Sequence, residues 1–245
     1  IVWLDNDTAL VTAEENRALL RVGIETGKVD QEIDTDSEIS HMVAVAKDHG
    51  LAFVANIGSG TVTIIDLALG IRLANVPTGK GAEGIAVTPN GRQVWVTNRA
   101  ENTISVLNAT GRKVVARIEA GEFPIRAEAT GDGRFVLVTN AKGDDLAVYA
   151  TREMKEVGRI SFTAVSKGDK GRLFSDRFGD SSVPIGIEIV DSEKRAYIAH
   201  ANADDISIVD LSQWKVVGTL SAGKEPDGMG WSPLSPRDEA ASVED

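Results

Sequence analysis

Hydrophobic and polar residues alternate along most of the chain in short runs, and one such pattern recurs. The stretch 93–108 (QVWVTNRAENTISVLN) is followed by the similar stretches 135–150 (FVLVTNAKGDDLAVYA) and 196–210 (AYIAHANADDISIVD). Each contains two alternating apolar runs of about five residues around a polar turn, which is typical of β-strands rather than helices. We therefore predict an all-β chain with no amphipathic helix over the repeat region.

The recurrence has a regular period. Equivalent segments begin at residues 41, 83, 125, 185 and 227, so the intervals are 42, 42, 60 and 42 residues. The long interval is the usual period plus an insertion. Four runs per repeat, separated by turns rich in Gly, Asn and Asp, predict one four-stranded antiparallel sheet per repeat. One column of the repeat holds Asn56, Asn98, Asn140 and His200, and another holds Phe53, Trp95, Leu137 and Tyr197.

A single sheet of this kind has two apolar faces, and packing copies face to face around an axis buries both. We therefore predict a single β-propeller domain over 1–245, with blades of about 42 residues. The expected limits are 1–40, 41–82, 83–124, 125–184 with an insertion at 161–182, 185–226, a partial blade at 227–233 and a tail at 234–245. Because such propellers commonly close at six to eight blades, we expect a seven-bladed parent; a five-bladed ring with a free tail is the alternative.

The repeat resembles a known family. VWVTN, LVTN and FVAN, preceded by TPNG or GDG turns, are similar to the YVTN-type β-propeller repeats of bacterial and archaeal proteins, as are 123–134 (FPIRAEATGDGR) and 223–233 (GKEPDGMGWSP). The resemblance covers nearly the whole chain and departs from the signature at 198–200 (IAH). It implies a propeller in a periplasmic or extracellular protein. Distant structural relatives of this family include lactonases and haem d1-binding propellers.

Composition narrows the range of partners. The 26 Lys and Arg against 37 Asp and Glu give a net charge of −11, which disfavours nucleic acid and anionic membrane surfaces. There is no cysteine, so disulfides and thiolate metal sites are excluded. No apolar run is long enough to span a membrane. The chain opens at Ile1 without Met, as a mature or trimmed product would.

Four residues occupy equivalent positions at the starts of predicted inner strands: His41, Glu83, Arg126 and Asp227. Inner strands of a propeller line its central funnel, where concave walls bring several side chains together. We therefore predict that this column is a binding site.

The insertion is a second candidate, because the repeat does not need it. Arg172, Phe174 and Arg177 place basic and aromatic groups on one loop of an acidic protein. Such groups suit the binding of an anionic or carbonyl-rich partner, and a long loop can also cover a ligand. The alternative is a tolerated excursion whose two phenylalanines pack against the blades.

The sequence contains three histidines, His41, His49 and His200. A pair of channel-facing imidazoles, His41 and His200, would suit a metal or an axial haem position, whereas hydrogen bonding at strand ends is the structural alternative. Neither a Gly-x-Ser-x-Gly nucleophile motif nor a HExxH zinc motif is present. We therefore predict no catalytic residue, and the sequence neither requires a cofactor nor identifies a metal.

Three functions remain open. The preferred one is a non-catalytic scaffold that engages a protein or small-molecule ligand at the funnel and at the 161–182 loop. The second is a lactonase-like, metal-dependent hydrolase that uses Glu83 and Asp227. The third is a propeller that binds haem or another cofactor through His41 or His200. The fold alone does not choose between them, and it does not give the oligomeric state.

Overall fold

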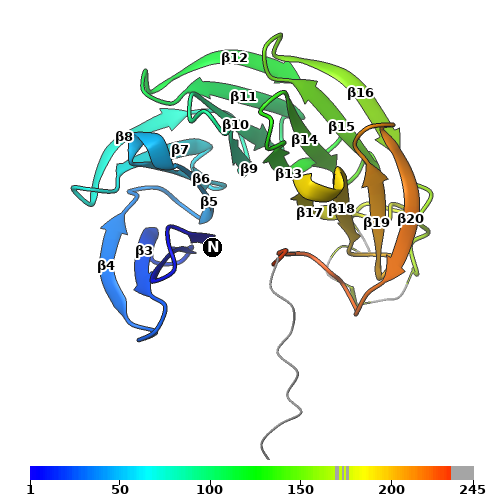
Figure 1. Ribbon diagram of the computed structural model, residues 1–245, viewed down its shortest axis with the longest axis horizontal. Coiled ribbons are helices and arrows are strands. Elements are labelled where there is room, and N and C mark those ends of the chain that lie inside the picture. The colour runs from blue at the N-terminus through cyan, green and yellow to red at the C-terminus, as the bar shows by residue number, and fades with distance from the viewer. Residues whose placement is uncertain (169–170, 173, 175–176, 233–245) are drawn as a thin grey trace, which may run out of the picture.

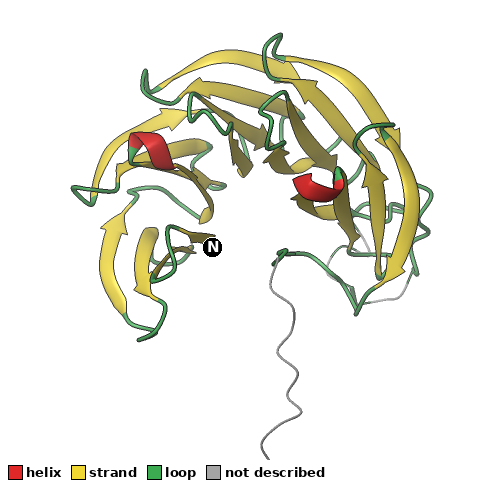
Figure 2. Cartoon of the chain, in the orientation of Figure 1, coloured by secondary structure: helices red, strands yellow, loops and turns green. Residues whose placement is uncertain are grey.

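The chain forms an all-β fold in which two single-turn 3₁₀ helices are the only helices of the described residues (Figure 2). The computed structural model describes residues 1–168, 171–172, 174 and 177–232. Its twenty strands form five four-stranded antiparallel sheets. The sheets follow one another in an arc around a common axis (Figure 1), which confirms the predicted β-propeller. Over this part of the chain, no helix combines the length and apolar character needed to cross a membrane.

Each sheet takes its four strands consecutively from the chain, with the first strand nearest the axis (Figure 1). The first sheet contains β1 (Val2–Trp3), β2 (Thr8–Ala13), β3 (Ala18–Gly23) and β4 (Val29–Asp34). The second contains β5 (Ser40–Ala46), β6 (Leu51–Asn56), β7 (Thr61–Asp66) and β8 (Ile71–Pro77), with the helix η1 (Lys47–His49) after β5. The third contains β9 (Ala82–Val87), β10 (Gln93–Asn98), β11 (Thr103–Asn108) and β12 (Lys113–Glu119).

The last two sheets flank the insertion. The fourth contains β13 (Pro124–Ala129), β14 (Phe135–Asn140), β15 (Asp145–Ala150) and β16 (Lys155–Ser161). The fifth contains β17 (Pro184–Val190), β18 (Arg195–His200), β19 (Asp205–Asp210) and β20 (Lys215–Ser221), with η2 (Asp191–Glu193) after β17. The insertion joins β16 to β17, as the long repeat interval predicts.

The first strands of the last four sheets recur at the intervals of the repeat, and the described residues 227–232 form no strand. The strands β5, β9, β13 and β17 each begin one residue before the predicted limit. Residues 222–232 contain no strand and do not extend any of the five sheets. Asp227 instead lies directly against β17, where a Cβ on Gly186 would collide with the Asp227 carbonyl oxygen. Pro233 and the tail at 234–245 lie outside the described residues, and the seven-bladed parent stays a prediction.

The hydrophobic core lies between neighbouring sheets. Trp95 of β10 and Tyr149 of β15 are fully buried, with ring centroids 6.1 Å apart, so these two residues connect the third and fourth sheets. Phe53 occupies the matching position of the second sheet and is also fully buried. Burying one such side chain contributes about 2 kcal/mol. Each sheet is therefore stabilised by the packing of these repeated side chains against the neighbouring sheet.

The recurrent polar column has a structural role. Its members, Asn56, Asn98, Asn140 and His200, are all fully buried at the ends of second strands. Asn98 Nδ2 donates to the hydroxyl oxygens of Thr103 and Ser105, both at 3.1 Å. His200 Nε2 lies 2.8 Å from Ser207 Oγ, at the same spacing of seven residues. The imidazole therefore takes over the hydrogen bond that asparagine makes in the second and third sheets.

Candidate functional site

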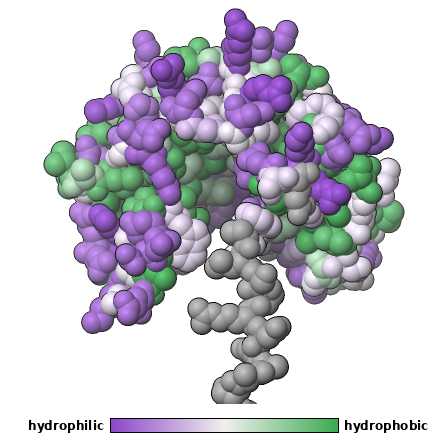
Figure 3. All heavy atoms as spheres, in the orientation of Figure 1, coloured by the Kyte–Doolittle hydropathy of each residue, from purple (hydrophilic) through white to green (hydrophobic). Residues whose placement is uncertain are grey.

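A cavity of about 460 Å³ lies between the inner strands. Residues of β1, β5, β9, β13 and β17 line it, together with Gly228 and Met229. In the space-filling view the arc is hollowed at its centre, while hydrophilic residues predominate around the outer rim (Figure 3). Val45, Val87 and Ile187 give the wall apolar character. This volume is within the usual range for a small-molecule pocket. We call it the channel cavity.

Five charged or titratable side chains meet at one end of the inner strands, and we call them the channel cluster: His41, Glu83, Arg99, Arg126 and Asp227. Glu83 is at the centre, with its side chain only 4% exposed. Arg99 Nη1 donates to Glu83 Oε2, and Arg126 Nη1 donates to Glu83 Oε1 at 2.8 Å. His41 Nε2 lies 3.4 Å from the same Oε1 atom, and Arg126 Nη2 lies 3.4 Å from Asp227 Oδ1.

His41 is held from its other ring nitrogen. Its Nδ1 atom contacts Glu14 Oε1 in the turn between β2 and β3, and Thr12 Oγ1 donates to its carbonyl oxygen at 2.6 Å. The pairing of β5 with β6 shifts register at this residue, and such irregularities re-aim a side chain. At 3.4 Å from Glu83, Nε2 makes at best a weak hydrogen bond. Nε2 is therefore the nitrogen available to a ligand.

The structure brings the predicted column together. His41, Glu83, Arg126 and Asp227 form one network. His41, Glu83 and Asp227 share one position of the repeat, and Arg126 lies one residue beyond it. The sequence-based prediction missed Arg99 and Glu14. Arg99 directly follows Asn98 of the recurrent polar column, so the repeat could have indicated where Arg99 lies. Glu14 lies in a turn of a different blade, and the repeat gives no sign of its contact.

Two carboxyl groups line the channel cavity. Burial raises the pKa of Glu128 to about 8, and the nearby carboxylates of Glu188 and Asp191 act in the same direction. Burial also raises the pKa of Glu188. The Glu128 carboxyl accepts a hydrogen bond from the Ile189 N–H at 3.2 Å. Glu128 is therefore mostly a neutral acid near pH 7, and it adds little negative charge to the cavity.

The raised pKa of Glu128 predicts a pH-dependent stability. Below about pH 4.5 the carboxyl is protonated in both states, so its contribution is fully present there. As pH rises towards about 8 the unfolded chain ionises first, and stability is lost. Glu128→Gln should therefore become more stable than wild type by about 4 kcal/mol near pH 8, and by about 1 kcal/mol near pH 5. Denaturant unfolding across this range tests it; a constant difference would contradict the assignment.

Two methionines add soft donors to the channel cavity. Met42 of β5 and Met229 both line it. Imidazole and thioether are both known axial ligands of haem iron, and the guanidinium of Arg126 suits a carboxylate of the macrocycle. Together with His41 in the adjoining channel cluster, this donor set fits a haem. Among the described residues there is no group of three His, Cys, Asp or Glu side chains placed to hold a metal ion by themselves.

His200, the other predicted imidazole, is unsuited to ligand binding. Its ring is fully buried, and Nδ1 and Nε2 lie 2.8 Å from the hydroxyls of Ser182 and Ser207. Burial lowers its pKa to about 4, so the ring is neutral. The hydrogen-bonding alternative therefore describes His200, which supports the fifth sheet and does not pair with His41.

The insertion packs on the sheets, and its Arg177 shares the Phe123 ring with Arg99 of the channel cluster. Arg172 is buried, and both of its Nη atoms pair with the Asp204 carboxylate, at 2.6 and 2.8 Å. The prediction that Arg172 binds a partner is therefore wrong, because its guanidinium anchors the loop. Phe174 stacks on Phe178, which packs in the core. Arg177 lies over Phe178 as well and alone among the three predicted residues lines an open pocket.

The comparisons with known proteins agree with this fold. The model of the cytochrome D1 heme domain family matches residues 6–232, and the chain belongs to this family. The YVTN resemblance is thus confirmed as far as a propeller-type family. A structure of Kuenenia stuttgartiensis hydrazine synthase superimposes with a TM-score of 0.65 at 14% identity, over 92% of this chain and 86% of that one. At this identity the likeness shows the fold alone. No curated protein matches the sequence.

Proposed function

We propose that this protein is a haem-binding propeller whose ligand occupies the channel cavity. The observation that carries the proposal is His41, a half-buried imidazole of the channel cluster, which shares Arg126 with the channel cavity. Its Nδ1 contacts Glu14, and its Nε2 has no contact shorter than 3.4 Å to Glu83. The family supports it, because its description names a heme domain. This favours the haem-binding alternative over the non-catalytic scaffold. By analogy with the family, we also propose that the protein works outside the cytoplasm.

The residues of the site have distinct parts in this proposal. His41, Met42 and Met229 would hold the haem iron. Arg126, whose side chain is only 15% exposed, would pair with a propionate. A bound haem iron would supply ligand binding or electron transfer, with a potential that these residues would tune.

Other side chains would orient the ligand-binding residues and determine the polarity of the cavity wall. Glu14 contacts His41 Nδ1, and this contact would orient the imidazole with Nε2 towards the ligand. Glu83 fixes Arg126 on one side of the cavity. Glu128, neutral near pH 7, places a hydrogen-bond donor on the cavity wall without a charge. The apolar side chains of the wall limit the entry of water.

Titration of the purified chain with haemin tests the proposal. We expect an absorbance change in the Soret region that saturates at one haem per chain, with visible bands typical of histidine ligation. A second titration in the presence of excess guanidinium chloride shows whether the change needs the folded protein. An unsaturable change, or the same change with the unfolded chain, would reject the proposed function.

Glu14→Gln should weaken haem binding without unfolding the protein. The amide still accepts or donates a hydrogen bond to His41 Nδ1 but lacks the carboxylate charge. Loss of such outer partners typically reduces affinity by about tenfold to a hundredfold. Glu15→Gln, in the same turn, is the matched control. Equal affinities for wild type and both variants would show that Glu14 does not orient the imidazole.

A further inference from the structure

A second pocket lies at the rim of the propeller, and we call it the rim pocket. It has a volume of about 560 Å³ and is lined by the turn after β6, the link from β8 to β9, the turn after β10 and the insertion. Its charged side chains are Lys80, Arg99, Glu101, Arg117 and Arg177. None of the described residues that line it also lines the channel cavity.

The charge of the rim pocket opposes that of the whole chain. The protein carries a net charge of −11, yet four cations and one carboxylate line this pocket. Concave basic surfaces raise the local concentration of anions. The positive charge of the rim pocket therefore predicts an anionic ligand, although the net negative charge of the chain repels anions.

Two of the four cations have internal carboxylate partners, and two do not. Arg99 pairs with Glu83, and Arg117 pairs with Glu101 at 2.9 Å. Within the described part of the chain, no carboxylate lies within 4 Å of the Lys80 or Arg177 charged groups. The pocket therefore keeps donors that the fold itself does not satisfy.

Aromatic contacts hold two of these guanidinium groups in place. The Arg177 guanidinium carbon lies 4.8 Å from the centroid of the Phe123 ring, and that of Arg99 lies 5.2 Å from it. Phe123 also packs on Phe178, with centroids 4.8 Å apart. Cation–π contacts of this kind restrict a long side chain before a ligand arrives. Two positive groups on one ring repel each other, and a bound anion would relieve that repulsion.

The link between β8 and β9 forms the floor of the rim pocket and needs glycine. Gly79 packs on the next turn so closely that a Cβ would lie 2.7 Å from Asn98 and Glu101 side-chain atoms. Gly81 has φ +73°, and a Cβ there would lie 2.9 Å from Arg99 Cγ. Lys80 stands between these two residues. Close packing of Gly79 and Gly81 therefore fixes the backbone of Lys80, from which its side chain extends.

We propose that the rim pocket binds an oxyanion: the carboxylate or phosphate group of a small organic molecule. Arginine binds planar oxyanions in a fork geometry, and lysine adds a point charge. Arg177 and Lys80 are the principal ligands, with Arg99 and Arg117 supporting them from ion pairs. The site is separate from the haem proposal, and its test needs no haem. Glu83 connects the two, because it contacts Arg99 of the rim pocket and Arg126 of the channel cavity.

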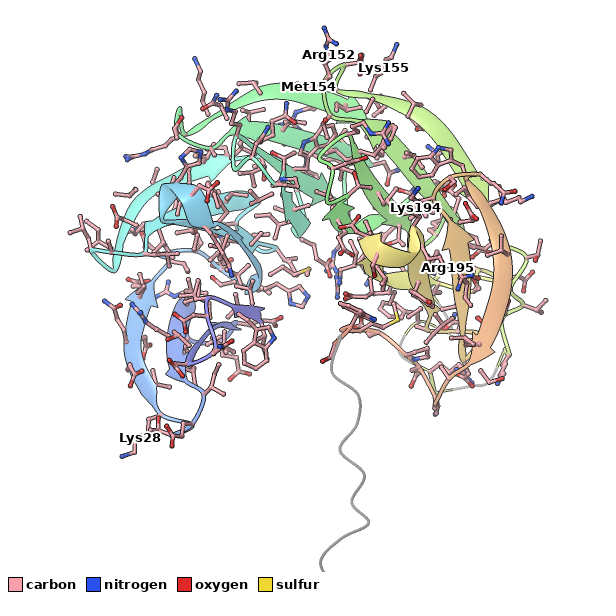
Figure 4. All side chains as sticks on the ribbon, viewed as in Figure 1. Lys28, Arg152, Met154, Lys155, Lys194 and Arg195 are labelled. Atoms are coloured by element: carbon pink, nitrogen blue, oxygen red, sulfur yellow. The ribbon has the colours of Figure 1, made fainter. Side chains whose placement is uncertain are left out.

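Calorimetric titration at low ionic strength with inorganic phosphate, and separately with citrate, tests the site. The test variant carries Lys80→Gln and Arg177→Gln. The control carries Arg152→Gln and Lys155→Gln, which removes one arginine and one lysine from the outer hairpin between β15 and β16 (Figure 4). Both lose the same charge. Thermal unfolding of each variant verifies that the fold is retained.

We expect wild type and control to bind at least one probe with equal affinity, and the test variant to bind it at least tenfold more weakly. The preferred probe identifies phosphate or carboxylate as the ligand group. Equal weakening in the control would mean that general charge, not this pocket, attracts the anion. That result, full binding by the test variant, or binding of neither probe would overturn the proposal.

Discussion

Glu83→Gln should lower the free energy of unfolding by about 3 kcal/mol. The Glu83 carboxylate is buried between the guanidinium groups of Arg99 and Arg126, and the amide compensates neither charge. Breaking a buried ion pair from one side leaves a charge without its partner, which is why the expected cost is large. The loss should appear in denaturant unfolding followed by tryptophan fluorescence.

The matched control for Glu83 is Glu122→Gln. Glu122 also forms an ion pair, with Lys142 at 2.6 Å, but both side chains are more than half exposed. Exposed pairs contribute about 0–1 kcal/mol. If Glu83→Gln cost no more than Glu122→Gln, the channel cluster would not be an organising element of the inner strands.

Gly84→Ala should destabilise the propeller by about 3 kcal/mol. A Cβ on Gly84 of β9 would lie 2.6 Å from the carbonyl oxygen of Ile125 and 2.7 Å from the Cα atom of Arg126. Both atoms belong to the backbone of β13, so no side-chain rotation relieves the contact. The inner strands would have to separate, and the distance between Glu83 and Arg126 would increase with them.

Gly218→Ala provides the control for Gly84. Gly218 lies on the outer strand β20, and a Cβ there would be 3.5 Å from Ile208 Cδ1, an ordinary contact. Its effect should lie within about 0.5 kcal/mol. Chemical denaturation of both variants compares them directly. Similar stabilities would show that the close approach of β9 and β13 is not needed for the fold.

The fold and the channel column were predictable because both depend on the repeat. A period of 42 residues fixes the strand order, and it places His41, Glu83 and Asp227 at one repeat position, with Arg126 one residue beyond it. These positions follow from backbone pairing, which the alternating pattern specifies. The side-chain partner of His41, Glu14, was not predictable, because their contact depends on the spacing of two blades.

Arg172 and His200 show a second limit of sequence reasoning. The basic Arg172 in the insertion was predicted to be a binding group. It instead forms an ion pair with Asp204 in a turn of the fifth sheet, and its side chain is buried. His200 suggested a ligand because it is a histidine, although its column predicted a hydrogen-bonding residue. In both cases the position within the repeat was more informative than the residue type. Arg177 was predicted to bind a partner and lines the rim pocket, and its role as a binding group stays a prediction.

Haemin titration of His41→Gln, compared with His49→Gln, tests the central claim most directly. His49 is an exposed hairpin residue, so its variant controls for the loss of an imidazole. The account predicts that His49→Gln binds haem with the wild-type spectrum and affinity, whereas His41→Gln loses the bands of histidine ligation and binds at least tenfold more weakly. A His41→Gln variant with the wild-type spectrum and affinity would contradict it.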